Sequence, residues 1–163
     1  MGAISYRSRT DTKSLPLGLF KVRITYDDTH FQIDYDKYSP RTIQSLKIVH
    51  TQDYDYTYKA SDRSGLKSLY EQKGKCDDIL IVKNGLVTDT YYTNVAFLQK
   101  GTWYTPKSPL LPGTMRQKLL DQGKIVKKDI PIDSIYKYSA VSLFNALNLH
   151  KSCIVKLKNV VIK

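Results

Sequence analysis

The sequence predicts a mixed α+β fold in which antiparallel hairpins outnumber helices. Apolar and polar residues alternate on both sides of an Asp-Asp-Thr turn within 20–35, and Asn84-Gly85 separates two apolar runs. Asn-Gly between apolar runs is the strongest short-range hairpin signal. Two further segments carry leucines at helical spacing and end at Gly74 and Gly123, as helices commonly do. Hairpins and helices mixed along one chain indicate the α+β class.

The first half of the chain is expected to be mainly β-structure. Residues 1–18 are polar and lack periodicity, which predicts irregular structure. Two strands are predicted within 20–35, a third at 45–50, and a short fourth at 54–60, where Tyr alternates with polar residues. A helix is predicted over 61–74, because a serine N-cap precedes two leucines and a tyrosine on one face.

The second half continues this mixture. The hairpin at 79–87 is followed by a second hairpin at 95–106, which turns at a Lys-Gly pair. A second helix is predicted over 112–124, since Pro-Gly precedes its apolar face and a glycine ends it. A short third helix is predicted at 133–138, and the alternating tail 153–163 predicts a final strand.

Composition limits the kinds of partner. The formal charge of +11 and 13 tyrosines invite a nucleic-acid partner, but Lys and Arg are scattered and no RNP, zinc-finger or KH signature is present. We therefore expect no nucleic acid; a basic nucleic-acid binder is the alternative, which steep salt dependence would reveal. No apolar run of 18 residues and no apolar N-terminal block occur, so we expect a cytoplasmic protein with no membrane partner. Cys76 and Cys153 form no metal-ligand spacing, and no metal site is expected.

Three short stretches carry residues that could do chemistry. Lys59 lies where a strand is predicted to meet a helix, and Asp89 and Asn94 stand five residues apart at the end of the apolar hairpin. Gly113 and Thr114 begin the second helix. Taken singly, these are ordinary features: a solvated lysine, a polar turn or edge, and a helix cap.

Taken together, the three stretches match the needs of one cofactor. A helix N-terminus offers free N–H groups and a positive dipole end, so it can hold a phosphate. A lysine beside an apolar sheet can form a Schiff base with an aldehyde. A carboxylate facing a ring nitrogen keeps a pyridinium protonated and makes the ring an electron sink. A phosphate, an aldehyde and a pyridine ring are the three parts of pyridoxal 5′-phosphate (PLP).

The order of these stretches resembles the fold-type IV PLP enzymes, the class IV aminotransferases. In that family a lysine precedes a strand–turn–strand with a carboxylate–x4–Asn element, and a Pro-Gly helix start follows. Here Lys59 is followed by NGLVTDTYYTNVAF (84–97) and then by TPKSPLLPGTMRQKLL (105–120). The resemblance implies that Lys59 is the catalytic, cofactor-bound lysine and that Asp89 faces the ring nitrogen, where most of the family has Glu. It implies that Asn94 stabilises that strand crossing.

The same resemblance implies contacts to the cofactor phosphate at the start of the second helix. Thr114, with the backbone of Gly113 and Met115, matches the family's phosphate loop. Arg116 follows in the motif and is expected to support the loop. Asn145 is a weaker match to a small polar residue that the family often places near the phosphate.

The resemblance also implies domains and partners. The expected fold is that of D-amino acid aminotransferases, with 1–18 as an irregular remnant of the small N-terminal domain and 19–163 as the PLP-binding C-terminal domain. A homodimer is expected, because family sites lie near a subunit interface. The expected substrate is a small-molecule amine or an amino acid.

Arg63 indicates a subgroup within this family. An arginine four residues after the lysine is typical of aminodeoxychorismate lyases, whereas branched-chain transaminases tend to continue with Gly-Gly-Asn-Tyr. Lys59-Ala-Ser-Asp-Arg63 fits the lyase form. The resemblance then implies a β-elimination that yields 4-aminobenzoate and pyruvate. A class IV aminotransferase acting on a small amino acid and a non-catalytic remnant of the fold are the alternatives.

Overall fold

The computed structural model describes residues 17–52 and 64–161; residues 1–16, 53–63 and 162–163 lie outside it. The chain divides into two compact units, one ending at Ser39 and one beginning at Pro40. The first hairpin therefore belongs to the first unit, although the sequence analysis grouped it with 19–163. Which family domain each unit represents stays a prediction. The predicted strand at 54–60 and the start of the predicted helix at 61–74 lie outside the described residues.

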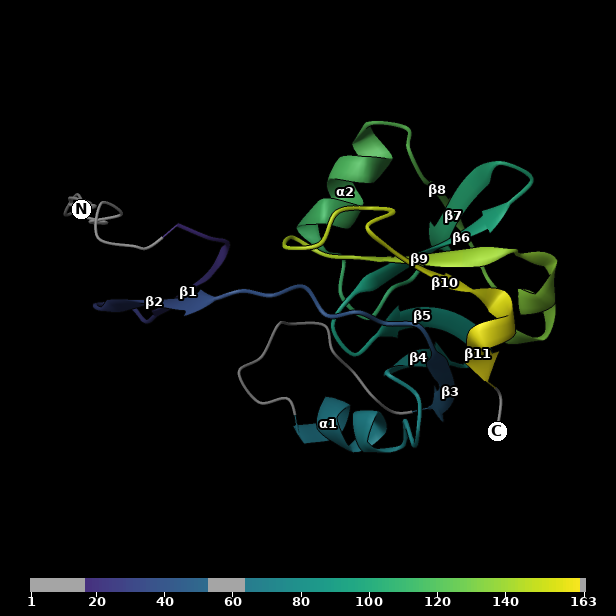
Figure 1. Cartoon of the computed structure of the whole chain (residues 1–163), viewed down its shortest axis with the longest axis horizontal. Coiled ribbons are helices and arrows are strands. Elements are labelled where there is room, and N and C mark those ends of the chain that lie inside the picture. Colours follow the sequence, from purple (N-terminus) through teal and green to yellow (C-terminus); the bar gives the residue numbers. More distant parts are fainter. Residues whose placement is uncertain (1–16, 53–63, 162–163) are drawn as a thin grey trace. The chain divides into compact units, whose positions relative to one another are not determined.

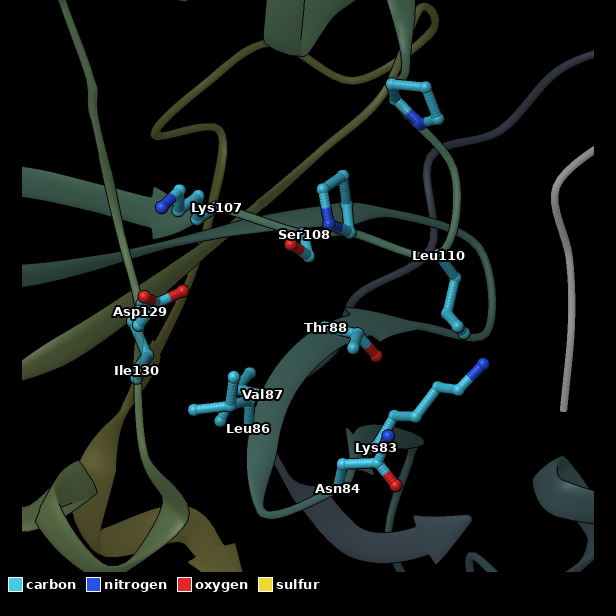
Figure 2. Close-up of a pocket in the computed structure, with 12 residues that line it drawn as sticks. Lys83, Asn84, Leu86, Val87, Thr88, Lys107, Ser108, Leu110, Asp129 and Ile130 are labelled. Carbon is cyan, nitrogen blue, oxygen red and sulfur yellow. The ribbon is translucent and has the colours of Figure 1, made fainter. Parts of the chain in front are cut away.

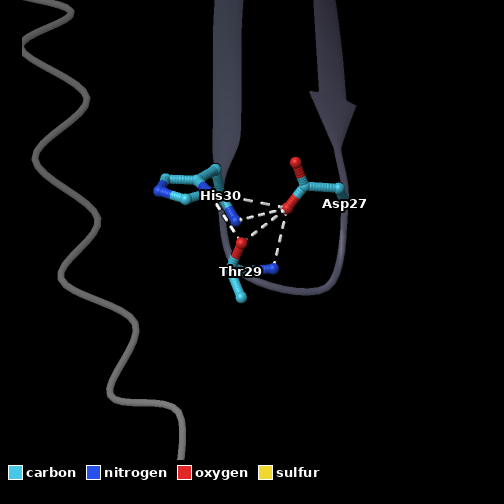
Figure 3. A network of polar contacts seen from close by, with 3 residues as sticks. All are labelled: Asp27, Thr29 and His30. Carbon is cyan, nitrogen blue, oxygen red and sulfur yellow. Dashed lines mark hydrogen bonds and ion pairs between the residues drawn. The ribbon is translucent and has the colours of Figure 1, made fainter.

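The first unit contains one antiparallel hairpin, as predicted. Strand β1 (Phe20–Tyr26) pairs with β2 (Phe31–Lys37). Figure 3 shows the turn between them, where the Asp27 carboxylate accepts hydrogen bonds from the N–H groups of Thr29 and His30, both at 2.7 Å. Both bonds lower the pKa of Asp27, and the bond from Thr29 N has the larger effect. The Asp-Asp-Thr segment thus forms a turn because its first side chain satisfies the turn's backbone donors.

The second unit contains two sheets and two short α-helices among its described residues (Figure 1). The four-stranded sheet has the order β11-β3-β4-β5, with bounds Val160–Val161, Leu46–Thr51, Asp78–Lys83 and Leu86–Thr90. The five-stranded sheet has the order β10-β9-β6-β7-β8, with bounds Cys153–Lys156, Ala140–Phe144, Asn94–Gln99, Thr102–Pro106 and Val126–Lys128. The helices are α1 (Ser64–Glu71) and α2 (Thr114–Asp121). Neither is long and apolar enough to cross a bilayer.

The main core lies between the two sheets. Leu80 and Val82 of β4 pack there against residues of the five-stranded sheet such as Phe97. Ile79 and Ile81, which point to the opposite face of β4, pack with α1. Both faces of β4 are therefore buried. A strand buried on both faces carries apolar residues throughout instead of alternating apolar with polar ones, which explains the continuous run Ile-Leu-Ile-Val. Helix α2 covers the outer face of the five-stranded sheet.

Several elements differ from the sequence-based expectations. Five strand pairs are antiparallel in the described structure, but β3–β4, β11–β3 and β7–β8 are parallel. Strands β8 and β9 were not predicted. The predicted tail strand is divided by a 3-10 turn, η3 (Leu157–Asn159), so β10 and β11 lie in different sheets. The predicted third helix is a 3-10 helix, η2 (Ile132–Lys137).

Candidate active site

The tight turn between β5 and β6 brings Asp89 and Asn94 together. Thr90 N donates to the Thr93 carbonyl at 2.9 Å, and Thr90 Oγ1 accepts a bond from Thr93 N at 3.0 Å. Across the closed turn, Asn94 Nδ2 donates to Asp89 Oδ1 at 2.8 Å. Asp89 is 5% exposed and Asn94 is 7% exposed. The carboxylate and the amide are therefore buried partners of one another.

The same pair anchors the loop that leads into α2. Leu111 N donates to Asp89 Oδ2 at 3.0 Å, and Asn94 Nδ2 donates to the Leu111 carbonyl at 2.7 Å. Gly113 lies so close to the Asn94 side chain that a Cβ at this position would overlap Asn94 Oδ1. A side chain at residue 113 is thus excluded by contact rather than by backbone conformation, since its φ of −66° suits any residue. The hairpin end consequently fixes where α2 begins.

The N-terminus of α2 exposes backbone donors. Its N-cap, Gly113, has no side-chain capping bond, and the first intrahelical bond runs from Gln117 N to the Gly113 carbonyl at 3.0 Å. The N–H groups of Thr114, Met115 and Arg116 therefore have no acceptor within the helix. Together with the positive end of the helix dipole, they are suited to an anion such as a phosphate.

Arg116 points away from this end and into the protein. The residue is buried, its Nε donates to Thr105 Oγ1 at 3.3 Å, and its Nη2 donates to the Pro106 carbonyl at 2.7 Å. Burial lowers the pKa of Arg116, and the charge of Asp89 opposes that shift. The arginine ties the first turn of α2 to the end of β7, and its support of a phosphate loop stays a prediction.

Asn145 lies at the same end of the five-stranded sheet. The register of β6 with β9 pairs Asn94 with Phe144, so Asn145 follows beside the turn between β5 and β6. Its Nδ2 donates to the Tyr92 carbonyl at 3.2 Å, and its Oδ1 accepts bonds from the N–H groups of Leu147 and Asn148 at 2.9 Å. These contacts hold two turns together. A contact of Asn145 with a phosphate stays a prediction.

Burial dominates the electrostatics of Asp89. It raises the pKa of Asp89 to about 6, against the opposing effects of the Asn94 and Leu111 hydrogen bonds and the Arg116 charge. Asn94 and Leu111 each donate to one oxygen of the carboxylate, and the Leu110 backbone adds a third hydrogen bond, whereas a carboxylate has about four lone-pair sites. Asp89 therefore retains the capacity to accept a further bond from a protonated ring nitrogen.

A second buried carboxylate, Asp78, reaches the same turn and was missed by sequence reasoning. Burial raises the pKa of Asp78 to about 6, while hydrogen bonds from Ile79, Tyr91 and Thr90 and the charge of Arg41 oppose the rise. The bond from Ile79 N measures 2.8 Å. The adjacent Asp77-Asp78 pair before an apolar strand looks like an ordinary polar turn, so the sequence carried no signal for it.

An aromatic cluster closes the outer side of this turn. The rings of Tyr70 and Tyr91 stack with centroids 4.3 Å apart, and Tyr92 meets the Tyr91 ring edge-on at the same distance. The Arg41 guanidinium donates to Tyr70 Oη at 3.2 Å and lies 5.2 Å from the centre of the Tyr92 ring. Sequence reasoning missed this cluster because its members are far apart in the chain.

The structure thus brings together most of the predicted cofactor residues. Asn94 contacts both Asp89 and Gly113, Gly113 caps the helix that Thr114 and Met115 begin, and Asn145 contacts the adjacent turn. Lys59 and Arg63 lie outside the described residues, and their roles stay predictions. Figure 2 shows a neighbouring pocket of about 470 Å³ between the start of β5 and the loop 107–112. The predicted residues of the described chain do not line that pocket.

Comparison with known proteins identifies the family. Residues 21–151 match the amino-transferase class IV family. The chain belongs to this family. An uncharacterized protein of Haemophilus influenzae is 41% identical over 130 residues, which cover 80% of this chain and 69% of that protein. A candidate aminodeoxychorismate lyase of Schizosaccharomyces pombe is 40% identical over 81 residues, or 46% of this chain and 35% of that protein.

Solved structures confirm the predicted fold. The crystal structure of a candidate 4-amino-4-deoxychorismate lyase from Haemophilus somnus 129pt has a TM-score of 0.77 and 38% identity, covering 81% of this chain and 68% of that one. A candidate amino-acid aminotransferase from Mesorhizobium loti has a TM-score of 0.73 at 20% identity, and shares the fold. The match covers 87% of this chain and 73% of the Mesorhizobium loti protein. The class IV chain is therefore α+β with the fold of fold-type IV PLP enzymes.

The described residues fit the cofactor that this family generally uses. Asp89 supplies a buried carboxylate with free acceptor capacity, and the uncapped start of α2 supplies donors for a phosphate. The hydrogen bonds from Asn94 and Leu111 join these two parts at a fixed separation. The arrangement suits a ligand that carries a basic ring nitrogen at one end and a phosphate at the other.

Proposed function

We propose that this class IV chain is a PLP-dependent lyase of the 4-amino-4-deoxychorismate type, which forms 4-aminobenzoate and pyruvate by β-elimination. The observation that carries the proposal is the buried Asp89, tied through Asn94 and Leu111 to the loop that begins α2. Support for the lyase comes from Arg63, four residues after Lys59, and from the two candidate lyases at 38% and 40% identity.

Each residue would have a distinct role. When bound, PLP supplies an electron sink conjugated to the carbon that bears the amino group. Asp89 would keep the ring nitrogen protonated, and Thr114 with the first N–H groups of α2 would hold the phosphate. Lys59 would bind the cofactor and then accept the proton from the amine-bearing carbon of the substrate as a general base.

The activity assay follows both products. The chain would be incubated with PLP and 4-amino-4-deoxychorismate, with pyruvate coupled to lactate dehydrogenase and 4-aminobenzoate followed by its fluorescence. We expect the two products in equal amounts and their loss in Lys59→Ala. Lys67→Ala, which removes an exposed lysine of α1, is the matched control and should retain activity. Pyruvate release that is equal in Lys59→Ala and the unaltered chain would contradict the lyase.

A class IV aminotransferase acting on a small amino acid is the second candidate. The fold shared with the Mesorhizobium loti protein is compatible with it. The discriminating observation is the fate of the amino group, because a transaminase passes it to a 2-oxo acid and releases no pyruvate from the lyase substrate. Failure of PLP to bind would instead favour a non-catalytic remnant of the fold.

We also propose that the chain acts in the cytoplasm as a homodimer on a small-molecule amine, without nucleic acid or membrane partners. The resemblance to the family, whose sites lie near a subunit interface, supports the dimer. Sedimentation velocity should give a mass of twice 18.7 kDa. A monomer at all concentrations would contradict an assembled site.

A further inference from the structure

A second hollow lies at the other end of α2, on the face of the five-stranded sheet that this helix covers. Its volume is about 400 Å³. The turn before β7, the turn after α2 and the loop between β9 and β10 form its walls, and they contribute Trp103, Lys124, His150 and Lys151. We refer to it as the lysine–tryptophan pocket. The predicted cofactor residues of the described chain are not among its lining residues.

The charge of this pocket is positive. Lys124 and Lys151 line it together with neutral residues, and its described lining contains no Asp or Glu. The Lys151 ammonium lies 5.9 Å from the centre of the Trp103 ring. At the nearby end of α2, the N–H groups of Gln122, Gly123 and Lys124 donate to three carbonyls of its last turn, which reduces the negative charge exposed there.

His150 adds an unpaired donor to the same wall. Its Nδ1 lies 3.0 Å from Ser142 Oγ, which also accepts a bond from Lys151 N at 2.9 Å. Both contacts are satisfied if the Ser142 hydroxyl donates to Nδ1, and the neutral imidazole then carries its proton on Nε2. Burial lowers the pKa of His150 to about 4, with smaller contributions from Lys151 and Lys124, so the neutral form is expected. Nε2 is buried and has no hydrogen-bond partner in the described structure.

We propose that the lysine–tryptophan pocket binds the anionic group, phosphate or carboxylate, of a small molecule. Two lysines line one hollow whose described lining contains no acidic residue, and an anion bound there would be attracted by both of their charges. Charge-assisted bonds to Lys124 and Lys151 would supply most of the affinity. Trp103, at 8% exposure, supplies an apolar wall of the pocket, and the Lys151 ammonium lies 5.9 Å from the centre of its ring.

This pocket is separate from the proposed cofactor site. Thr114 begins α2 and Asp121 ends it, which at 1.5 Å per residue places the two ends about 10 Å apart. The cofactor phosphate would use the N-terminal end, whereas the lysine–tryptophan pocket lies beyond the C-terminal end. Occupation of one site therefore does not require occupation of the other, and the two proposals can fail independently.

Trp103 makes the test specific, because it is the single tryptophan of the chain. Sodium phosphate and, separately, sodium acetate would be titrated at pH 7 and constant ionic strength while Trp103 fluorescence is recorded. We expect a saturable change with phosphate, acetate or both, and the tighter anion identifies the preferred group. In the double variant Lys124→Gln/Lys151→Gln the affinity should fall about a hundredfold, since two charge-assisted bonds are lost and each is worth about tenfold.

The matched control is the double variant Lys67→Gln/Lys118→Gln, which removes the same net charge from exposed helix positions and should keep the wild-type affinity. The ring nitrogens of His150, followed by NMR in the unaltered chain, should shift with the same midpoint as the fluorescence. An equal loss in both double variants, or a change that never saturates, would overturn the proposal. Loss of the response in Thr114→Val would also overturn it, because the anion would then lie at the start of α2.

Discussion

Asn94 satisfies several polar groups at once where an apolar hairpin ends. Its amide donates to both Asp89 and the Leu111 carbonyl, while Leu111 N donates back to Asp89. Because all these groups are buried or half-buried, removal of the Asn94 amide takes one donor from Asp89 and one from the Leu111 carbonyl. A buried polar group left unpaired costs more than a hydrogen bond contributes.

Replacement of this amide tests the bridge. In Asn94→Ala we expect the free energy of unfolding to fall by about 2–4 kcal/mol, because a carboxylate and a carbonyl lose their donors. Urea unfolding measures this change. Thr93→Ala is a control in the same turn and should cost less, since Thr93 is half-buried and its hydroxyl shares a bond only with Thr90. An equal cost for both variants would contradict the special role of Asn94.

The contact between Gly113 and Asn94 gives a second test at the residue scale. Gly113→Ala should lower stability by about 1–3 kcal/mol, the usual cost of overpacking, and should weaken PLP binding by displacing the start of α2. The double variant Gly113→Ala/Asn94→Ala removes the overlap. Its cost should therefore be smaller than the sum of the two single changes. Strict additivity would show that the glycine is not required by this contact.

Helix α2 owes its position to contacts at both ends rather than to a strong apolar stripe. Its N-terminus follows the loop held by Asp89 and Asn94, and Arg116 joins its first turn to β7. Leu119 packs on the sheet from its second turn. The free N–H groups at its start, which we propose bind the phosphate, are thus held in a fixed geometry by neighbouring strands although the helix is short.

Loss of the Arg116 contacts should therefore loosen the start of the helix. Arg116→Met keeps a long buried side chain but leaves Thr105 Oγ1 and the Pro106 carbonyl without this donor. We expect a loss of about 2–4 kcal/mol in stability and a weaker PLP affinity, measured by equilibrium dialysis. Lys118→Met, exposed on the same helix, should change neither. Unchanged PLP affinity in Arg116→Met would contradict this positioning role.

The elements with strong local signals could be predicted from the sequence. The hairpin at Asn84-Gly85 and the helix after Pro112-Gly113 have turn and cap residues that act over short distances. Strand β9 (Ala140–Phe144) could not, because both of its faces are covered and its residues show no alternation. Asp89 and Asn94 were identified from their position in the ordered series of motifs. Their hydrogen bonds to Leu111 could not be predicted, because only the fold brings this residue to them.

At the scale of the whole molecule, two buried carboxyls and the half-buried His150 give stability a specific pH dependence. Burial raises the pKa values of Asp78 and Asp89 to about 6, so between about pH 4 and 6 the folded chain binds more protons than the unfolded chain. Stability from these carboxyls therefore falls as pH rises through this range. The lowered pKa of His150 has the opposite effect, because the folded chain then binds fewer protons between about pH 4 and 6.5.

Replacement of one carboxyl should change this balance measurably. A pKa of about 6 in place of 3.8 for Asp78 corresponds to about 3 kcal/mol. Asp78→Asn should therefore gain about 2–3 kcal/mol in stability relative to the unaltered chain as the pH rises from 4 to 7. Urea unfolding at pH 4.5 and pH 7 measures the difference. A stability difference that is the same at both pH values would show that Asp78 titrates normally in the fold.

The central claim concerns the whole constellation: a lysine, a buried aspartate and a helix start that together hold PLP. The most direct test is to saturate the chain with PLP, record the visible spectrum, reduce with borohydride and map the modified lysine by mass spectrometry. We expect one phosphopyridoxyl group on Lys59, with lower occupancy in Asp89→Asn and Gly113→Ala at the same PLP concentration. Modification spread over surface lysines, with Lys59 unmodified, would contradict the account.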